Sequence, residues 1–168
     1  MSRMFCSCTS SKKINFSNFN TSNVEDMNTM FHNYPLLKEL NLSNFDTTNV
    51  TDMSGMFVGC SSLKELNLSN FNTIKVTDMN NMFNECNLLD KLDISNFDTS
   101  NVTEVFFMFN KCRLLKELNL SNFKTNKVTS MRKMFSGCSS LKKLDISNFS
   151  TINVTDMSFM LCFISVNL

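Results

Sequence analysis

The sequence contains very little glycine or proline. Its 168 residues include 3 Gly and 1 Pro, together with 1 His, 1 Tyr and no Trp. This scarcity argues against a Gly-rich or disordered linker anywhere in the chain. Turns must therefore be built mainly from Asn, Ser, Asp and Thr, whose short polar side chains satisfy a tight backbone by hydrogen bonding.

The chain also lacks a strong charge of either sign. The 16 Lys and Arg residues balance 15 Asp and Glu residues, leaving a net charge of +1. This balance gives no global attraction to nucleic acid, so we predict no nucleic-acid partner. No run of about 18 apolar residues occurs, so we predict no membrane span. The N-terminal stretch 1–6 lacks the apolar core of a secretory signal peptide.

The sequence has a strict internal repeat with a period of 26 residues. Valine and threonine recur in columns at this period, and so does phenylalanine, at Phe19, Phe45, Phe71, Phe97, Phe123 and Phe149. A register held without insertion or deletion indicates a repeat fold in which every copy stacks on its neighbour. We predict that residues 1–168 form a single repeat array of about six and a half units, with both ends lying within repeats.

Each unit is predicted to contain one short strand and one short helix. Leucines alternate with polar residues toward the end of 63–68, as in a half-buried strand. Over 76–86 the apolar residues fall at i, i+3, i+6, i+7 and i+10, which is one face of a short helix. In the preceding unit, Asn49 and Asp52 resemble a helix start. The expected fold class is α/β, a right-handed solenoid with all strands in a single parallel sheet.

The repeat motif is Leu-x-x-Leu-x-Leu-Ser-Asn-Phe followed by Thr-x-x-Val-Thr-Asp-Met-x-x-Met-Phe. It resembles the 26-residue repeat of the BspA-like leucine-rich-repeat surface proteins of bacteria, over essentially the whole chain. This resemblance implies a leucine-rich-repeat-like solenoid that is displayed at the cell surface or outside the cell and binds host or matrix proteins. Because the chain has no signal peptide, a cytoplasmic location stays open.

Two residue types could suggest chemistry. The cysteine column continues the apolar face of each unit and consists of Cys8, Cys60, Cys86, Cys112 and Cys138. We predict buried, unbridged thiols, because the 26-residue spacing matches no compact zinc motif. His32, the single histidine, has no nucleophile or carboxylate in a recognisable relation to it. We therefore predict no enzymatic activity, no cofactor and no metal site.

Polar columns between the buried leucines are the candidate binding surface, because the open sheet of such a solenoid is its usual binding face. The unit at 88–94 reverses the order of basic and acidic residues found in its neighbours. The alternative is a solvated sheet on which Lys and Glu neutralise each other. The candidate binding residues are Lys38, Lys64, Lys116, Lys142, Glu39, Glu65, Glu117, Asn41, Asn67, Asp93, Asn119 and Asp145.

The leading hypothesis is a non-enzymatic protein-interaction module, part of a cell-surface adhesion or host-binding leucine-rich-repeat protein. Its partner would be a protein or another macromolecule bound on the strand face. Two alternatives are a structural spacer or self-assembling stalk, and an intracellular leucine-rich-repeat scaffold. The apolar segment 161–168 has no charged residue. It predicts either end-to-end self-association or a small cap that folds over the last repeat.

Overall fold

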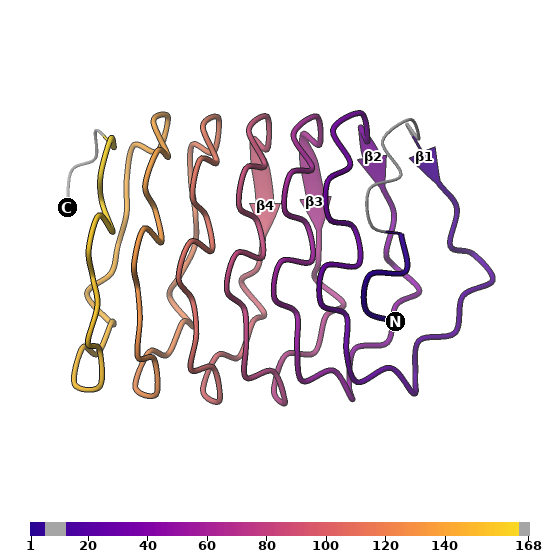
Figure 1. The fold of residues 1–168 in the computed structure, drawn as a ribbon, viewed down its shortest axis with the longest axis horizontal. Coiled ribbons are helices and arrows are strands. Elements are labelled where there is room, and N and C mark those ends of the chain that lie inside the picture. The colour runs from indigo at the N-terminus through magenta and orange to yellow at the C-terminus, as the bar shows by residue number, and fades with distance from the viewer. Residues whose placement is uncertain (6–12, 165–168) are drawn as a thin grey trace.

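The protein is a stack of similar coils, one for each 26-residue unit (Figure 1). The computed structural model describes residues 1–5 and 13–164. Residue number rises from one end of the stack to the other. Each inner coil therefore lies between the unit before it and the unit after it. Backbone partners in neighbouring coils occupy the same position of successive units where strands pair, as for Leu66 and Leu92.

The described residues form four short strands at one side of the coils: β1 (Lys13–Ile14), β2 (Glu39–Leu40), β3 (Glu65–Asn67) and β4 (Lys91–Asp93). They pair in parallel as β1 with β2 and β3 with β4, which gives two sheets of two strands each. The prediction of a single parallel sheet is therefore wrong. Turns limit the length of the strands. The side chain of Asn67, the last residue of β3, accepts a hydrogen bond from the backbone N–H of Ser69 (2.9 Å), which forms the turn after the strand.

The predicted helix in each unit is also wrong, and with it the α/β fold class. The described residues contain no helix, and therefore none that is long and apolar enough to cross a membrane. Over 76–86 the chain instead makes consecutive turns. The N–H of Asn84 bonds to the carbonyl of Asn81 (2.9 Å), three residues back. Asn81 (φ 56°) and Glu85 (φ 64°) adopt the left-handed conformation, which no right-handed helix contains.

The turn segments of neighbouring coils lie closer together than packed helices can. The rings of Phe57 and Phe83 in successive units lie 5.7 Å apart, whereas packed helices need about 8–10 Å between their axes. Turn segments are thin enough to hydrogen-bond directly to the next coil. The N–H of Phe83 donates to the carbonyl of Met108 (2.9 Å), where a helix would direct it to Met79.

The two residues predicted to start a helix instead join coils. Asp52 forms parallel backbone bridges with Asp26 in the preceding unit and Asp78 in the following one. Its side chain accepts a hydrogen bond from the N–H of Ser54 (2.7 Å), which shapes the first turn of the segment. The Asn49 amide donates to the carbonyl of Ser22 in the preceding unit (2.8 Å).

The core runs through the centre of the stack as columns of identical or similar side chains. One column contains Phe31, Phe57, Phe83, Phe109 and Phe135, all fully buried. Successive rings of this column lie 5.6–5.7 Å apart and within 11° of parallel. Buried Val, Met, Cys and Leu columns surround it. The side chains that suggested one face of a helix are thus buried, although they are carried by turns.

Candidate functional site

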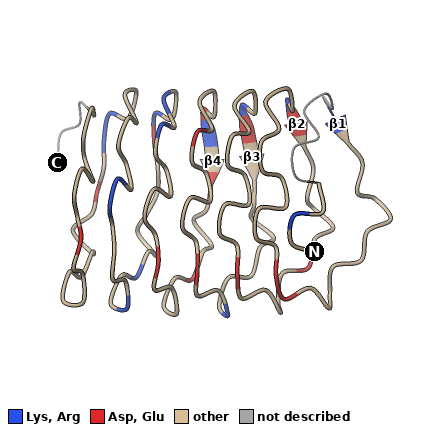
Figure 2. Cartoon of the chain, viewed as in Figure 1, with Lys and Arg blue, Asp and Glu red and all other residues tan. Residues whose placement is uncertain are grey.

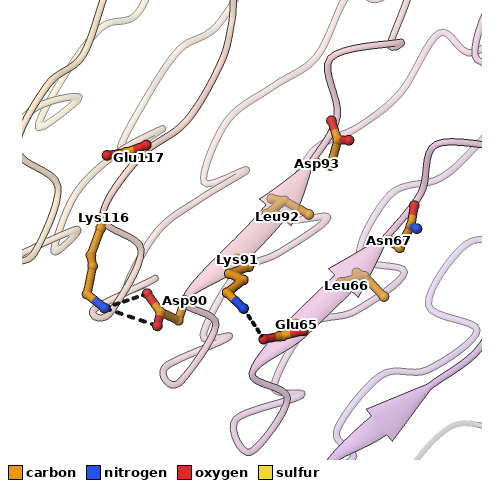
Figure 3. A pocket seen from close by; sticks show the side chains of 9 residues that line it. All are labelled: Glu65, Leu66, Asn67, Asp90, Lys91, Leu92, Asp93, Lys116 and Glu117. Atoms are coloured by element: carbon orange, nitrogen blue, oxygen red, sulfur yellow. Dashed lines mark hydrogen bonds and ion pairs between the residues drawn. The ribbon is translucent and has the colours of Figure 1, made fainter.

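The candidate site is the strand face, formed by the outward side chains of residues 13–15, 38–41, 64–67, 90–93, 116–119 and 142–145. Side chains alternate in β3, where Glu65 and Asn67 are exposed on either side of buried Leu66. Beside β3 and β4 lies an open hollow of about 530 Å³ (Figure 3). Its lining residues are Glu65, Leu66, Asn67, Asp90, Lys91, Leu92, Asp93, Lys116 and Glu117.

Ion pairs join neighbouring coils across this hollow. Lys91 Nζ lies 2.6 Å from Glu65 Oε1, and Lys116 Nζ lies 3.0 Å from Asp90 Oδ1 (Figure 3). The hydrogen bond and the charge of Glu65 raise the pKa of Lys91 above its usual value. A similar pair joins β1 to β2. The side chains of these pairs are exposed, so their charges remain accessible to a partner. Exposed ion pairs of this kind contribute little to stability.

Lys38 and Lys64 differ from the lysines that form these pairs. Both are exposed, and neither forms an ion pair within the described part of the chain. They line a second open hollow of about 670 Å³ together with half-buried Leu40 and exposed Leu88. Glu39 and Glu65 also line it, but their carboxylates are paired with Lys13 and Lys91. Here two cations at the same position of successive units lie beside exposed apolar surface.

The predicted Asn and Asp column shapes the backbone. Asp93 accepts hydrogen bonds from both the N–H (3.1 Å) and the hydroxyl (2.7 Å) of Ser95, and these bonds lower the pKa of Asp93 below its usual value. The backbone bond to a residue two positions ahead recurs at Asn41, Asn67, Asn119 and Asp145. These side chains end the strand segments, and their role in binding stays a prediction.

The remaining predicted residues divide between the two hollows and the last coils. Glu39 lines the second hollow with Lys38 and Lys64. Lys142 is exposed, but like Asn119 and Asp145 it lines neither hollow. Our candidate set omitted Asp90 and Lys91, which carry two of the inter-coil ion pairs. The sequence did contain a signal for these two ion pairs, because the reversed unit at 88–94 places opposite charges at matching positions of neighbouring units.

Two polar columns, one of buried threonines and one of exposed asparagines, bond to the neighbouring coils. Buried Thr73 donates its hydroxyl to the carbonyl of Asp98 (2.9 Å) and accepts a hydrogen bond from the N–H of the same residue (2.8 Å). The Asn96 amide donates to the carbonyl of Phe71 (2.7 Å). Both columns form hydrogen bonds with backbone groups of the neighbouring coil, so their role is to hold the coils together.

The cysteine column is internal. Cys86 is fully buried, and its thiol donates to the carbonyl of Phe57 (3.2 Å). Burial raises the pKa of the Cys60 thiol to about 12, which disfavours the reactive thiolate. The described residues contain no cluster of three or more side chains that could hold a metal ion. Cys8, the first member of the cysteine column, lies outside the described residues. The single histidine, His32, is half-buried, and its Nδ1 atom has no hydrogen-bond partner in the described residues.

An acidic column lies where the turn segments begin. Asp52, Asp78 and Glu104 occupy successive positions in one line of parallel backbone bridges. Figure 2 shows acidic segments recurring from coil to coil. Burial raises the pKa of Asp78 above its usual value, and the negative charges of Asp52 and Glu104 raise it further. Ionisation of Asp78 therefore destabilises the fold.

Replacing Asp78 with Asn is expected to raise the free energy of unfolding at neutral pH by up to about 1 kcal/mol, because opposed like charges are removed. Asn can still accept the hydrogen bond from the N–H of Asn80. Since the folded-state pKa of Asp78 is raised, the wild-type chain loses stability as pH rises above 3.8, and the difference between the two proteins disappears below that pH.

Asp98→Asn is the matched control, measured by urea unfolding across the same pH range. Hydrogen bonds to Ser100 and the charge of Lys124 lower the pKa of Asp98, so its ionised form stabilises the fold above pH 3.8 and loses this effect as pH falls. Its replacement should reduce stability at neutral pH. Equal effects of both substitutions, or destabilisation by Asp78→Asn, would contradict the assignment.

Comparison with protein families identifies the chain by its repeats. The model of the family described as "Mycoplasma protein of unknown function, DUF285" matches residues 1–117 and again residues 88–164. The two matches overlap, as expected for a sequence that repeats, and together they cover most of the chain. No curated protein and no solved structure matches it. The chain belongs to the DUF285 family.

Proposed function

We propose that the chain is a non-enzymatic protein-interaction module that binds its partner on the strand face. The observation that carries this proposal is the pair Lys38 and Lys64, exposed and without an ion pair in the described part of the chain, beside Leu40 and Leu88. Cations next to exposed apolar surface can contact both the carboxylates and the apolar side chains of a partner.

The rest of the repeat supports this choice of surface. Its Thr and Asn columns bond to the neighbouring coils, and its Phe, Met and Cys columns are buried in the middle coils. On the strand face, charged side chains project from successive coils at a fixed spacing, and such an array provides an extended surface for a protein partner. The resemblance to BspA-like repeats favours a host or matrix protein as partner and a location at the cell surface.

Self-association is a second candidate, favoured by apolar side chains on the last described coil. Ile152 and Phe163 are each 82% exposed. In the predicted C-terminal segment, Leu161 and Ile164 pack partly against the core, while Val166 lies outside the described residues. Both alternatives for this segment, association and a cap, stay predictions, and sedimentation of the chain at several concentrations separates them.

The strand-face proposal predicts that the double substitution Lys38→Glu and Lys64→Glu weakens partner binding at least tenfold, because it places like charges against the partner's carboxylates. Biolayer interferometry against partners recovered by cross-linking to the wild-type chain measures this effect. The matched control reverses Lys75 and Lys127, two exposed lysines outside the strand face. If the control variant loses binding and the strand-face variant does not, the proposed surface is wrong.

A further inference from the structure

A column of left-handed residues runs along the turn segments. Left-handed backbone costs about 1–2 kcal/mol for most residues, and Gly and Asn adopt it most readily. Gly55 and Asn81 in the middle coils follow this preference, whereas Arg3 and the last three coils place large side chains there. The column consists of Arg3, Thr29, Gly55, Asn81, Phe107, Lys133 and Phe159, with φ between 49° and 60°.

The large residues of this column meet on the surface. The ammonium group of Lys133 lies 5.3 Å from the ring centre of Phe107 and 5.4 Å from that of Phe159, so the cation sits between two aromatic rings. Phe159 is 58% exposed. Phe163 occupies a second left-handed position (φ 61°) and is also largely exposed. We call Phe107, Lys133, Phe159 and Phe163 the turn-face cluster.

The turn-face cluster borders a hollow of about 680 Å³ with an excess of positive charge. Besides Lys133, the charged residues that line it are Lys111, Arg113 and Glu85. The only acidic group among these lining residues is already paired, because Glu85 Oε1 lies 2.6 Å from Lys111 Nζ. Arg113 and Lys133 are therefore left to attract an anionic group, next to exposed aromatic rings.

We propose that the turn-face cluster is a second binding surface, separate from the strand face, that docks an acidic protein segment carrying apolar side chains. The segment's carboxylates face Arg113 and Lys133, and its apolar side chains contact the rings of Phe159 and Phe163. Aromatic residues and Arg are enriched where proteins bind one another. Residues held in strained backbone conformations cluster at functional sites in proteins.

A fluorescein-labelled peptide of alternating Glu and Leu is the probe, with fluorescence anisotropy as the measurement. It should bind the full chain, and a peptide of alternating Lys and Leu should not. The double substitution Arg113→Glu and Lys133→Glu should weaken binding at least tenfold, since it reverses the two cations of the hollow that no carboxylate pairs with in the described residues. The control, Lys75→Glu with Lys127→Glu, makes the same change of net charge elsewhere and should leave binding unchanged.

Phe159→Asn separates binding from folding. Asn tolerates the left-handed conformation better than Phe does, so this variant should keep the unfolding midpoint of the wild-type chain while it loses peptide affinity. Three results would each overturn the proposal: no binding of the Glu/Leu peptide, equal losses in the two charge-reversed variants, or equal binding by Phe159→Asn and the wild-type chain.

Discussion

Phe83→Ala is expected to lower the free energy of unfolding by about 3–5 kcal/mol, the range observed when a buried phenylalanine is truncated to alanine. Phe83 is fully buried and lies between the parallel rings of Phe57 and Phe109, at 5.7 and 5.6 Å. Its removal leaves a cavity in the middle of the stack and removes ring contacts with both neighbouring coils. Urea unfolding monitored by circular dichroism measures the loss.

Phe159→Ala is the control for this substitution. It removes the same side-chain atoms from a residue that is 58% exposed, and should cost less than about 1 kcal/mol. If Phe83→Ala does not fold, Phe83→Leu keeps the test available at a smaller loss, because leucine fills much of the cavity. Equal losses at Phe83 and Phe159 would contradict a continuous aromatic column as a main source of stability.

Thr73→Val is expected to destabilise the protein by about 1–3 kcal/mol for each backbone group left without its hydrogen bond. Valine has nearly the same shape as threonine but lacks the hydroxyl, which in Thr73 bonds to both the carbonyl and the N–H of Asp98. Both backbone groups belong to the next coil. The substitution therefore weakens the contact between two repeats without creating a cavity.

Thr77→Val is the matched control, because Thr77 is exposed and its hydroxyl makes one longer hydrogen bond, to the carbonyl of Thr51 (3.3 Å). It should change stability by no more than about 0.5 kcal/mol. Amide hydrogen exchange can show where Thr73→Val acts, and we expect faster exchange at Asp98. Unchanged exchange at Asp98 would contradict the role given to the threonine column.

The 26-residue register predicted which side chains are buried, but it did not predict the backbone that carries them. Apolar residues at the spacing found over 76–86 fit a helix face and equally fit a series of turns. Contrary signals were present, because Gly55, Gly59 and Asn81 lie within the predicted helices and all three adopt positive φ. The deciding quantity, a coil spacing too small for helices, depends on how units stack and cannot be seen in one unit.

The contacts on the candidate strand face were likewise only partly visible in one unit, and their role in binding stays a prediction. Reading the polar columns one by one identified Lys38 and Lys64, whereas the ion pair of Lys91 with Glu65 becomes visible only when two units are aligned side by side. Phe107 and Lys133 occupy a column whose residue type varies, so no repeat pattern in the sequence singles them out. Their proximity comes from the left-handed turns, which the helix prediction left out.

The central claim is that turn segments bonded to the next coil replace helices in the repeats that the structure describes. NMR scalar couplings across hydrogen bonds test this directly, because they identify the carbonyl that each N–H contacts. The structure predicts a coupling between the amide nitrogen of Phe57 and the carbonyl carbon of Met82, whose oxygen lies 2.9 Å away. A coupling from the Phe57 amide to the carbonyl of Met53, the helical partner four residues back, would contradict the account.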